Sequence, residues 1–269
     1  MDTDVAKRSS PTERPGSGSL PDGFELTEWG PGKSAIITGG STGIGRALAI
    51  LLGARGARVM ICGRNRAELD DALAALDQAG ADAEGIVADV SKPSDVERLF
   101  DMADGWIGGP LDLLVNNAGV AAEDAAGTDI DSIGYVVSTN LLGAMYCTHH
   151  ALARMRPVGR GVIVTVGSMS ADVREEGSSV YVATKSGLQG FSAALRKEVS
   201  GEGIRVVLVE PGATGTDMNE NSVEEQRAKE AASELLKAED VALVILGALC
   251  MPPRADVVEV AVRPALQAI

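Results

Sequence analysis

Residues 34–45 read SAIITGGSTGIG, a short aliphatic run that leads directly into a glycine-rich turn. The amphipathic stretch at 46–54 is predicted to continue the chain as a helix. A strand, a turn and a helix start bring unpaired backbone N–H groups and the positive end of a helix dipole to one place, which suits an anion. The turn therefore predicts a phosphate cradle. A simple glycine-rich turn is the alternative, because the Gly-x3-Gly-x-Gly spacing departs from the Gly-x-Gly-x-x-Gly form.

Beyond this turn, short aliphatic runs alternate with amphipathic stretches, the pattern of a parallel sheet with helical crossovers. Most runs are too apolar for strands with one wet face, so helices should cover both sides of the sheet. We predict an α/β fold, a single doubly wound (Rossmann) domain with a seven-stranded, mostly parallel sheet. Its strands are expected at 34–37, 58–61, 85–88, 111–115, 162–166, 205–209 and 257–262.

The first 31 residues differ from the rest, because Ser, Pro and Gly break any periodicity. We predict a flexible N-terminal tail over 1–31 and a dinucleotide-binding catalytic domain over 32–269. Phe24, Leu26 and Trp29, near the end of the tail, are candidates to fold back onto the body in a structural role.

Composition limits the partners of this 269-residue chain. Its 38 acidic and 24 basic residues give a net charge of −14, which argues against nucleic acid or an anionic membrane as the main partner. Because no apolar run reaches the length of a membrane span and no secretory signal is present, we expect a cytoplasmic protein. The spacing of Cys62, Cys147 and Cys250 indicates buried thiols, and we expect no metal site.

From about Lys33 to Arg263 the chain resembles the short-chain dehydrogenase/reductase family, whose glycine fingerprint is TGxxxGxG. The resemblance rests on several motifs that occur in the family's order, and each of them alone is weak. The matching positions are Thr38–Gly45, Asp89-Val90, Asn116-Asn117-Ala118-Gly119, Asn140, Ser168, Tyr181 with Lys185 as YxxxK, and Pro211-Gly212 with Thr216.

The resemblance implies a set of residues that hold a nicotinamide dinucleotide. Several of them follow predicted strands, where doubly wound folds bind ligands. The implied cofactor-binding residues are Gly39, Ser41, Thr42, Gly43, Ile44, Gly45, Arg64, Asn65, Asp89, Val90, Asn117, Ala118, Gly119, Tyr181, Lys185, Pro211, Gly212, Thr214 and Thr216.

The end of the second predicted strand bears on the choice between NAD and NADP. NAD enzymes usually place a carboxylate there to bind both ribose hydroxyls. Here Gly63 stands in its place and Arg64 follows, a side chain suited to a phosphate. We therefore expect NADP(H), although Arg64 at a strand end could simply face water, and Thr42 stands where many NADP-preferring relatives carry a second basic residue.

Four residues are expected to act in catalysis. Reduction of a carbonyl needs a proton for its oxygen, and Tyr181 is the candidate acid. Lys185, one helical turn along, would place an ammonium near the phenol, which favours the ionised form of a phenol. Ser168 can donate a hydrogen bond to the substrate oxygen. The resemblance alone gives Asn140 a role, to hold a water that links Lys185 to solvent; otherwise it would bond backbone in an irregular helix.

The segment at about 214–237 resembles the family's mobile lid over the substrate. The C-terminal sequence is similar to the branch of NADP-dependent 3-hydroxy acid dehydrogenases and clavaldehyde reductases. Arg174 is a candidate to hold a substrate carboxylate, with a surface ion pair to Glu175 or Glu176 as the alternative.

These observations predict an NADPH-dependent oxidoreductase acting on a small ketone, aldehyde or 3-oxo/3-hydroxy acid, with Tyr181 as acid and base. One alternative is a 3-oxoacyl reductase that acts on a carrier-bound substrate. Another is a catalytically silent dinucleotide-sensing protein. Relatives are commonly oligomeric, which implies a homodimer or homotetramer.

Overall fold

The computed structural model describes residues 23–219 and 221–267, and the following account refers to these residues. They form one seven-stranded sheet in the order β3-β2-β1-β4-β5-β6-β7, in which every neighbouring pair is parallel. The strands are β1 (Ser34–Thr38), β2 (Arg58–Gly63), β3 (Asp82–Val87), β4 (Leu113–Asn116), β5 (Gly161–Val166), β6 (Ile204–Pro211) and β7 (Glu259–Val262). The doubly wound prediction is confirmed, and "mostly parallel" becomes all parallel.

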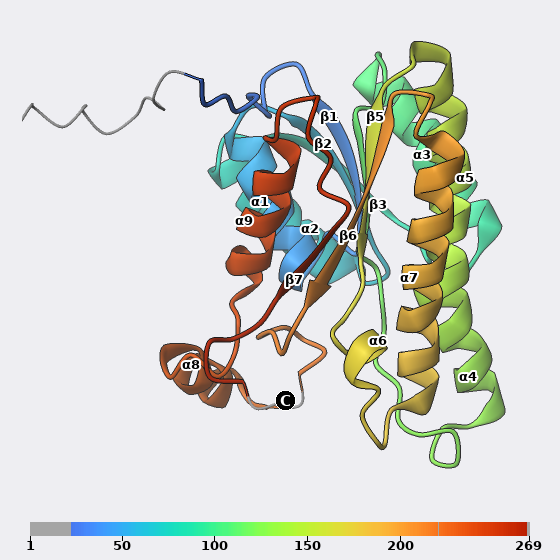
Figure 1. The fold of residues 1–269 in the computed structure, drawn as a ribbon, viewed down its shortest axis with the longest axis vertical. Coiled ribbons are helices and arrows are strands. Elements are labelled where there is room, and N and C mark those ends of the chain that lie inside the picture. The colour runs from blue at the N-terminus through green and yellow to red at the C-terminus, as the bar shows by residue number, and fades with distance from the viewer. Residues whose placement is uncertain (1–22, 220, 268–269) are drawn as a thin grey trace, which may run out of the picture.

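Helices cover both faces of this sheet (Figure 1). They are α1 (Gly43–Ala54), α2 (Arg66–Gln78), α3 (Pro93–Ile107), α4 (Ile130–Val137), α5 (Gly143–Met155), α6 (Ser170–Val173), α7 (Ser179–Val199), α8 (Val223–Ala231) and α9 (Ala238–Leu249). A π-helical turn at Ser138–Leu142 joins α4 to α5, and a 3₁₀ turn at Arg156–Val158 follows α5.

The hydrophobic core has two layers, one on each side of the sheet. Leu48 of α1, Leu69 of α2 and Ile245 of α9 are fully buried in one layer. Phe100 of α3 and Cys147 of α5 are fully buried in the other. The strands β1 to β6 contribute side chains to both layers, because successive residues point to opposite faces, whereas the edge strand β7 contributes to the first layer only. This two-sided burial explains why the strands read as continuous aliphatic runs.

Three strands begin two or three residues away from their predicted starts. β3 begins at Asp82, earlier than the apolar run, because its pairing with β2 starts at Asp82 opposite Arg58. β4 begins at Leu113 and not at Leu111, since the Asp112 carboxylate accepts the backbone N–H of Ser34 (3.1 Å) at the strand entrance. β7 is shorter than the predicted run and begins at Glu259.

The segment before β1 lies partly against the body. Trp29 is buried, and its carbonyl accepts a hydrogen bond from Arg55 Nε (3.0 Å). Thr27 N donates to the Cys250 carbonyl at 2.7 Å. Phe24 and Leu26 are exposed, so only Trp29 of the three candidate apolar residues packs into the core. Residues 1–22 of the predicted tail lie outside the described residues.

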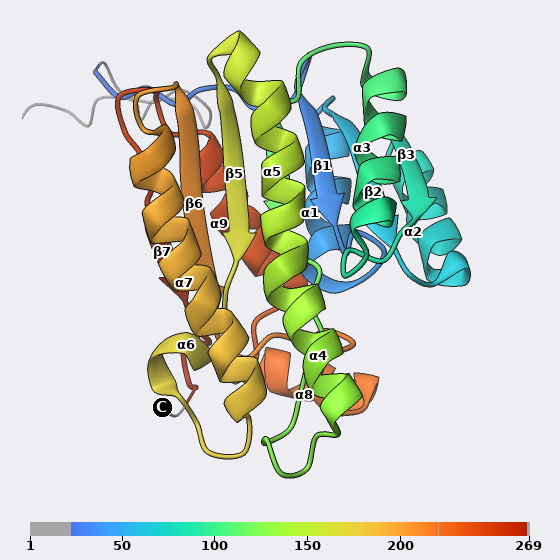
Figure 2. The same cartoon turned by 90° about the vertical axis from the view of Figure 1, so that its right-hand side faces the viewer.

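The carboxyl ends of the strands all lie at one edge of the sheet, together with α4, α6 and α8 (Figure 2). The loops that follow β1, β4, β5 and β6 therefore meet there, as expected for the ligand-binding edge of a doubly wound fold. Within the described ranges, no helix combines the length and apolar character needed to span a membrane.

Candidate active site

The glycine turn after β1 is closely packed against the end of β4. A Cβ on Gly45 would lie 2.3 Å from the Gly39 carbonyl oxygen and 2.5 Å from Asn117 Nδ2. Gly39 has φ +62°, and a Cβ there would lie 2.9 Å from Ala118 Cα. Because no side chain fits at either position, the backbone of the turn stays open to a ligand at the start of α1.

Hydrogen bonds hold the turn in this position. Asn117 Nδ2 donates to the carbonyl oxygens of Thr38 and Gly39, both at 3.0 Å. The Thr38 hydroxyl accepts the backbone N–H groups of Asn117 (3.0 Å) and Ala118 (3.1 Å), and donates to the Val115 carbonyl. Thr38 was not singled out as a site residue, although it opens the fingerprint that carries the resemblance.

A cavity of about 400 Å³ lies beside the turn, over the ends of β2 and β3. Nine of the predicted cofactor-binding residues line it: Gly39, Ser41, Thr42, Arg64, Asn65, Asp89, Val90, Ala118 and Gly119. Gly63 also lines it, and a Cβ at this position would lie only 2.5 Å from Ser41 Oγ. The chain thus has no carboxylate, and no space for one, at the point where the NAD-binding acid would stand.

Arg64 is held over an aromatic ring at the edge of this cavity. Its guanidinium carbon lies 5.6 Å from the centroid of Tyr135, and its NH1 donates to the Tyr135 hydroxyl. That hydroxyl donates in turn to Asp89 Oδ2 at 3.4 Å. Arg64 is itself exposed, and the contact holds its guanidinium at the rim of the cavity. Tyr135 was missed in the sequence because it belongs to no motif and approaches Arg64 only through the fold.

Asn65 has a second role that competes with ligand binding. Its side-chain oxygen accepts the backbone N–H of Ala67 (2.9 Å), which caps the start of α2. An Asn at this position is a common helix N-cap. Asn65 therefore lines the cavity mainly as the cap of α2.

A second cavity, of about 550 Å³, brings together the three central catalytic candidates Ser168, Tyr181 and Lys185. The turn that carries Ser168 is fixed to β6, since Gly167 N donates to the Val209 carbonyl (2.7 Å) and Met169 N to the Pro211 carbonyl (2.9 Å). Ser168 Oγ accepts the backbone N–H of Ser170 at 3.2 Å. Its own proton is therefore free to be donated to a ligand.

Lys185 lies one turn along α7 from Tyr181, as the spacing predicts. Its Nζ is 5.5 Å from the centroid of the Tyr181 ring and donates to the Val166 carbonyl at 3.0 Å. Lys185 is only 4% exposed. The structure thus places a buried ammonium beside the ring of Tyr181.

Asn140 is buried in the π-helical turn between α4 and α5. Its side chain bonds the backbone of Val120 twice, accepting from N (2.8 Å) and donating to O (2.9 Å). A Cβ on Gly119 would lie 3.5 Å from Asn140 Oδ1 and 3.9 Å from Lys185 Nζ, so both side chains flank Gly119. The Asn140 side chain thus holds the loop after β4 beside Lys185.

The loop after β6 forms the opposite wall of the second cavity. Pro211, Gly212, Thr214 and Thr216 line this cavity, as do Asn117 and Ile44. A Cβ on Gly43 would lie 3.2 Å from Thr216 Cγ2, so this loop meets the glycine turn. Gln267 also lines the cavity, and its side-chain oxygen accepts the backbone N–H of Ala213 at 3.2 Å. No sequence signal marked Gln267, because its role depends on the return of the chain after β7.

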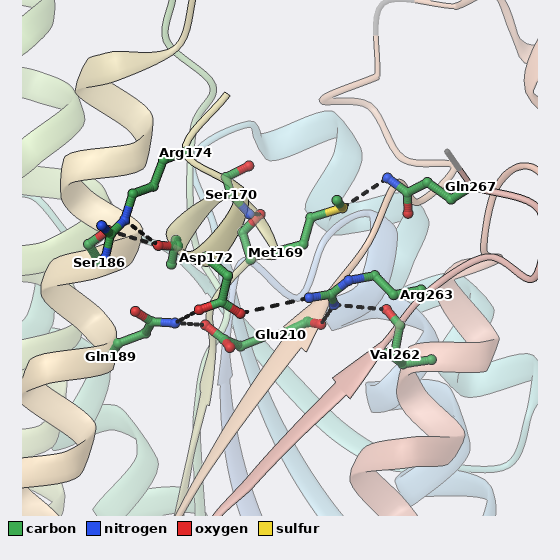
Figure 3. A network of polar contacts seen from close by, with 12 residues as sticks. Met169, Ser170, Asp172, Arg174, Ser186, Gln189, Glu210, Val262, Arg263 and Gln267 are labelled. Carbon is green, nitrogen blue, oxygen red and sulfur yellow. Dashed lines mark hydrogen bonds and ion pairs between the residues drawn. The ribbon is translucent and has the colours of Figure 1, made fainter. Parts of the chain in front are cut away.

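A network of polar contacts lies next to the turn that carries Met169 and Ser170 (Figure 3). Gln189 Nε2 donates both to Asp172 Oδ1 (2.8 Å) and to Glu210 Oε1 (2.9 Å). Glu210 is fully buried, and burial raises its pKa from 4.5 to about 7, against a smaller lowering by Gln189. Asp172 and Glu259 raise this pKa further, whereas Arg263 lowers it.

The residues present fit a nicotinamide dinucleotide. The two cavities adjoin the glycine turn on either side, and the turn offers backbone N–H groups where a pyrophosphate would lie.

Cys62, Cys147 and Cys250 are buried and free, and burial raises the pKa of Cys62 to about 12, which keeps this thiol protonated. Among the residues with described positions, no group of His, Cys, Asp and Glu is arranged to hold a metal ion.

Comparisons with known proteins agree with this arrangement. Residues 33–227 match the model of the short chain dehydrogenase family. The 3-oxoacyl-[acyl-carrier-protein] reductase of Bos taurus is 41% identical over 72% of this chain and 80% of its own. The FabG 3-oxoacyl-[acyl-carrier-protein] reductase of Escherichia coli (strain K12) is 36% identical over 73% of this chain and 80% of its own.

Solved structures show the same fold. An actinorhodin polyketide ketoreductase with NADPH superimposes with a TM-score of 0.77 at 30% identity, covering 86% of this chain and 95% of its own. A short chain dehydrogenase from Burkholderia cenocepacia J2315 in complex with NADP gives a TM-score of 0.76 at 31% identity, covering 87% and 96%. With its fingerprint, its YxxxK pair and these relatives, the chain belongs to the short-chain dehydrogenase/reductase family of oxidoreductases.

Proposed function

We propose that this protein is an NADPH-dependent reductase of a small carbonyl compound. One observation carries the proposal: Ser168, Tyr181 and Lys185 line a single cavity of about 550 Å³, together with Ile44 of the glycine turn and Gly212 of the loop after β6. A proton donor, a hydrogen-bond donor and an ammonium thus meet where the nicotinamide end of a dinucleotide would lie. The C-terminal resemblance to the 3-hydroxy acid dehydrogenase branch remains a prediction.

The chain's own groups supply the acid chemistry. When bound, NADPH supplies a hydride for the carbonyl carbon. Ser168 donates its free proton in a hydrogen bond to the carbonyl oxygen, which stabilises the negative charge that develops there. Tyr181 gives its phenolic proton to the same oxygen, so that the carbonyl becomes an alcohol. Lys185 stabilises the phenolate that remains, and Asn140 holds the loop after β4 beside Lys185.

NADPH is proposed over NADH on the basis of Arg64 and Gly63. Arg64 lies at the cavity over Tyr135, and no carboxylate is present at position 63 to repel a 2′-phosphate. The structures with NADPH and NADP among the solved relatives support this choice.

A panel of ketones, aldehydes and 3-oxo esters, mixed in turn with NADPH and NADH, tests the proposal. We expect at least one carbonyl compound to cause loss of the near-ultraviolet absorbance of the reduced nicotinamide, faster with NADPH. Absence of turnover with both nucleotides, despite measurable NADPH binding, would instead support the dinucleotide-sensing alternative.

Reduction of a carrier-bound 3-oxoacyl group is the second candidate. It is favoured by the identity to two proteins named 3-oxoacyl-[acyl-carrier-protein] reductases. The net charge of −14 disfavours an acidic carrier, since like charges slow association. Comparing kcat/KM for one acetoacetyl group on an acyl carrier protein and on a small thiol separates the two: a strong preference for the carrier would establish this second function.

A further inference from the structure

The charge in the second cavity is unevenly distributed. Of the described residues that line it, only Lys185 and Glu175 carry a charge. Lys185 is buried beneath the reacting end, with its ammonium bonded to the Val166 carbonyl. A substrate that extends away from Tyr181 therefore meets one charge, the carboxylate of Glu175.

Glu175 is tied to the catalytic turn. The Ser170 hydroxyl donates to Glu175 Oε1, and the Ser170 backbone N–H donates to Ser168 Oγ. Ser170 is itself buried, at 6% exposed. Ser170 thus places the carboxylate within a short chain of hydrogen bonds from the serine that would hold the carbonyl oxygen. One donor leaves most of the acceptor capacity of an ionised carboxylate free.

Arg174, the basic sequence neighbour of Glu175, forms its hydrogen bond elsewhere. Arg174 Nε donates to the Ala171 carbonyl at 3.3 Å, and its side chain lies beside α7 (Figure 3). Arg174 is not among the residues that line the cavity, and no ion pair within the described ranges involves Arg174, Glu175 or Glu176. The ion pair of Arg174 with Glu175 or Glu176 is therefore not formed in this structure, and contact of Arg174 with a substrate carboxylate stays a prediction.

We propose that Glu175 sets the substrate class: the enzyme prefers carbonyl compounds that carry a protonated amine, accepts neutral hydrogen-bond donors, and disfavours carboxylates. The proposal rests on the reductase function proposed above. A substrate amine would form a charge-assisted hydrogen bond with Glu175, whereas a substrate carboxylate placed there would be repelled and, among the described lining residues, would meet a positive charge only at Lys185. Free 3-oxo acids, which the sequence alone left open, become poor candidates.

Three acetophenones of similar size test this preference. They carry an aminomethyl, a hydroxymethyl or a carboxylate group at the para position, and none can cyclise. We expect kcat/KM to be about 10-fold higher for the amine than for the carboxylate at low salt, with the alcohol between them, and this ratio to shrink as salt screens the charge.

Two variants isolate the role of the carboxylate. Glu175→Gln keeps the size and the acceptor but removes the charge, and should lower the amine-to-carboxylate ratio to about 1 or 2. Glu176→Gln removes the same charge from the adjacent residue, which is exposed like Glu175 but does not line the cavity, and should leave the ratio unchanged. An unchanged ratio in Glu175→Gln, or a wild-type protein that prefers the carboxylate, would overturn the proposal.

A binding measurement separates this proposal from the reductase function. The Kd of each acetophenone is measured on Tyr181→Phe saturated with NADPH, with and without Glu175→Gln. We expect tighter binding of the amine than of the carboxylate, and loss of this difference with Glu175→Gln. If the wild type reduces none of the three ketones, the order of these Kd values still decides the role of Glu175, and equal values would refute it.

Discussion

Ser41 occupies the space that a side chain at position 63 would need. A Cβ on Gly63 would lie 2.5 Å from Ser41 Oγ and 2.9 Å from Ser41 Cβ. The absence of a ribose-binding carboxylate is therefore linked to the packing between the glycine turn and the end of β2. A change of cofactor preference at Gly63 depends on Ser41 as well.

Gly63→Asp alone should lower stability and weaken both nucleotides, because the new side chain collides with Ser41. Combined with Ser41→Gly, the same Asp should fit and move the preference towards NADH, since a carboxylate binds ribose hydroxyls and repels a 2′-phosphate. Titration of each variant with NADPH and NADH, followed by nucleotide fluorescence, measures this change. Equal affinities of the single and the double variant for NADPH and for NADH would show that Ser41 does not block a side chain at position 63.

Arg64→Asp should weaken NADPH far more than NADH, by about 10- to 100-fold in relative Kd, because it replaces a phosphate-binding cation with an anion. Arg66→Asp is the matched control, since Arg66 is an exposed residue two positions on that forms an ion pair with Asp70. The same ratio of the Kd for NADPH to the Kd for NADH in both variants would argue against a 2′-phosphate contact by Arg64.

Tyr181→Phe should reduce carbonyl turnover by about 1000-fold or more while leaving the Kd for NADPH within a few-fold of its original value. The substitution removes one hydroxyl and keeps the ring that lies 5.5 Å from Lys185 Nζ. Single-turnover kinetics with saturating NADPH give the rate of the chemical step. Substantial remaining activity would mean that another group supplies the proton.

Because of Glu210, the free energy of unfolding should fall as the pH rises from about 4.5 to 7. Burial raises the pKa of Glu210 from 4.5 to about 7, so the folded protein keeps a proton that the unfolded chain loses. The contribution of Glu210 to the free energy of unfolding is fully present below pH 4.5 and is lost as the pH rises through about 7. Each pKa unit corresponds to about 1.4 kcal/mol.

Urea unfolding between pH 5 and about 8 tests this dependence through the free energy of unfolding at each pH. Glu210→Gln, which mimics the protonated form, should flatten the curve. Glu259→Gln alters an exposed acid near the same network, and the free energy of unfolding of this variant should still fall with pH almost as steeply as in the wild type. A Glu210→Gln curve parallel to that of the wild type would contradict the assignment.

Removal of residues 1–22 should leave turnover and Tm unaltered, because we predict that this part of the chain adds nothing to the core. Trp29→Ala, by contrast, should lower stability by about 3 kcal/mol, since it empties a buried site. Phe24→Ala is the control for the segment between them, because Phe24 is 69% exposed. Calorimetry gives the Tm of the truncated protein, of Trp29→Ala and of Phe24→Ala, and we expect a clear decrease only for Trp29→Ala.

The sequence by itself determined the fold class, the number of strands and the motifs that meet at the binding edge. Aliphatic runs and glycine spacing are local patterns, and the carboxyl ends of parallel strands must lie together, so Ser168, Tyr181 and Pro211 could be assigned to one cleft in advance. Lys185 followed Tyr181 by helix periodicity alone.

Only the tertiary structure decided which side chains face one another across distant segments. Arg64 meets Tyr135, Gln267 reaches Ala213, and Ser41 fills the space beside Gly63. The same holds for Arg174 and Glu175, neighbours of opposite charge that turn to different surroundings. Such pairings depend on the packing of whole elements, because a side chain's partner in space has no fixed distance along the chain.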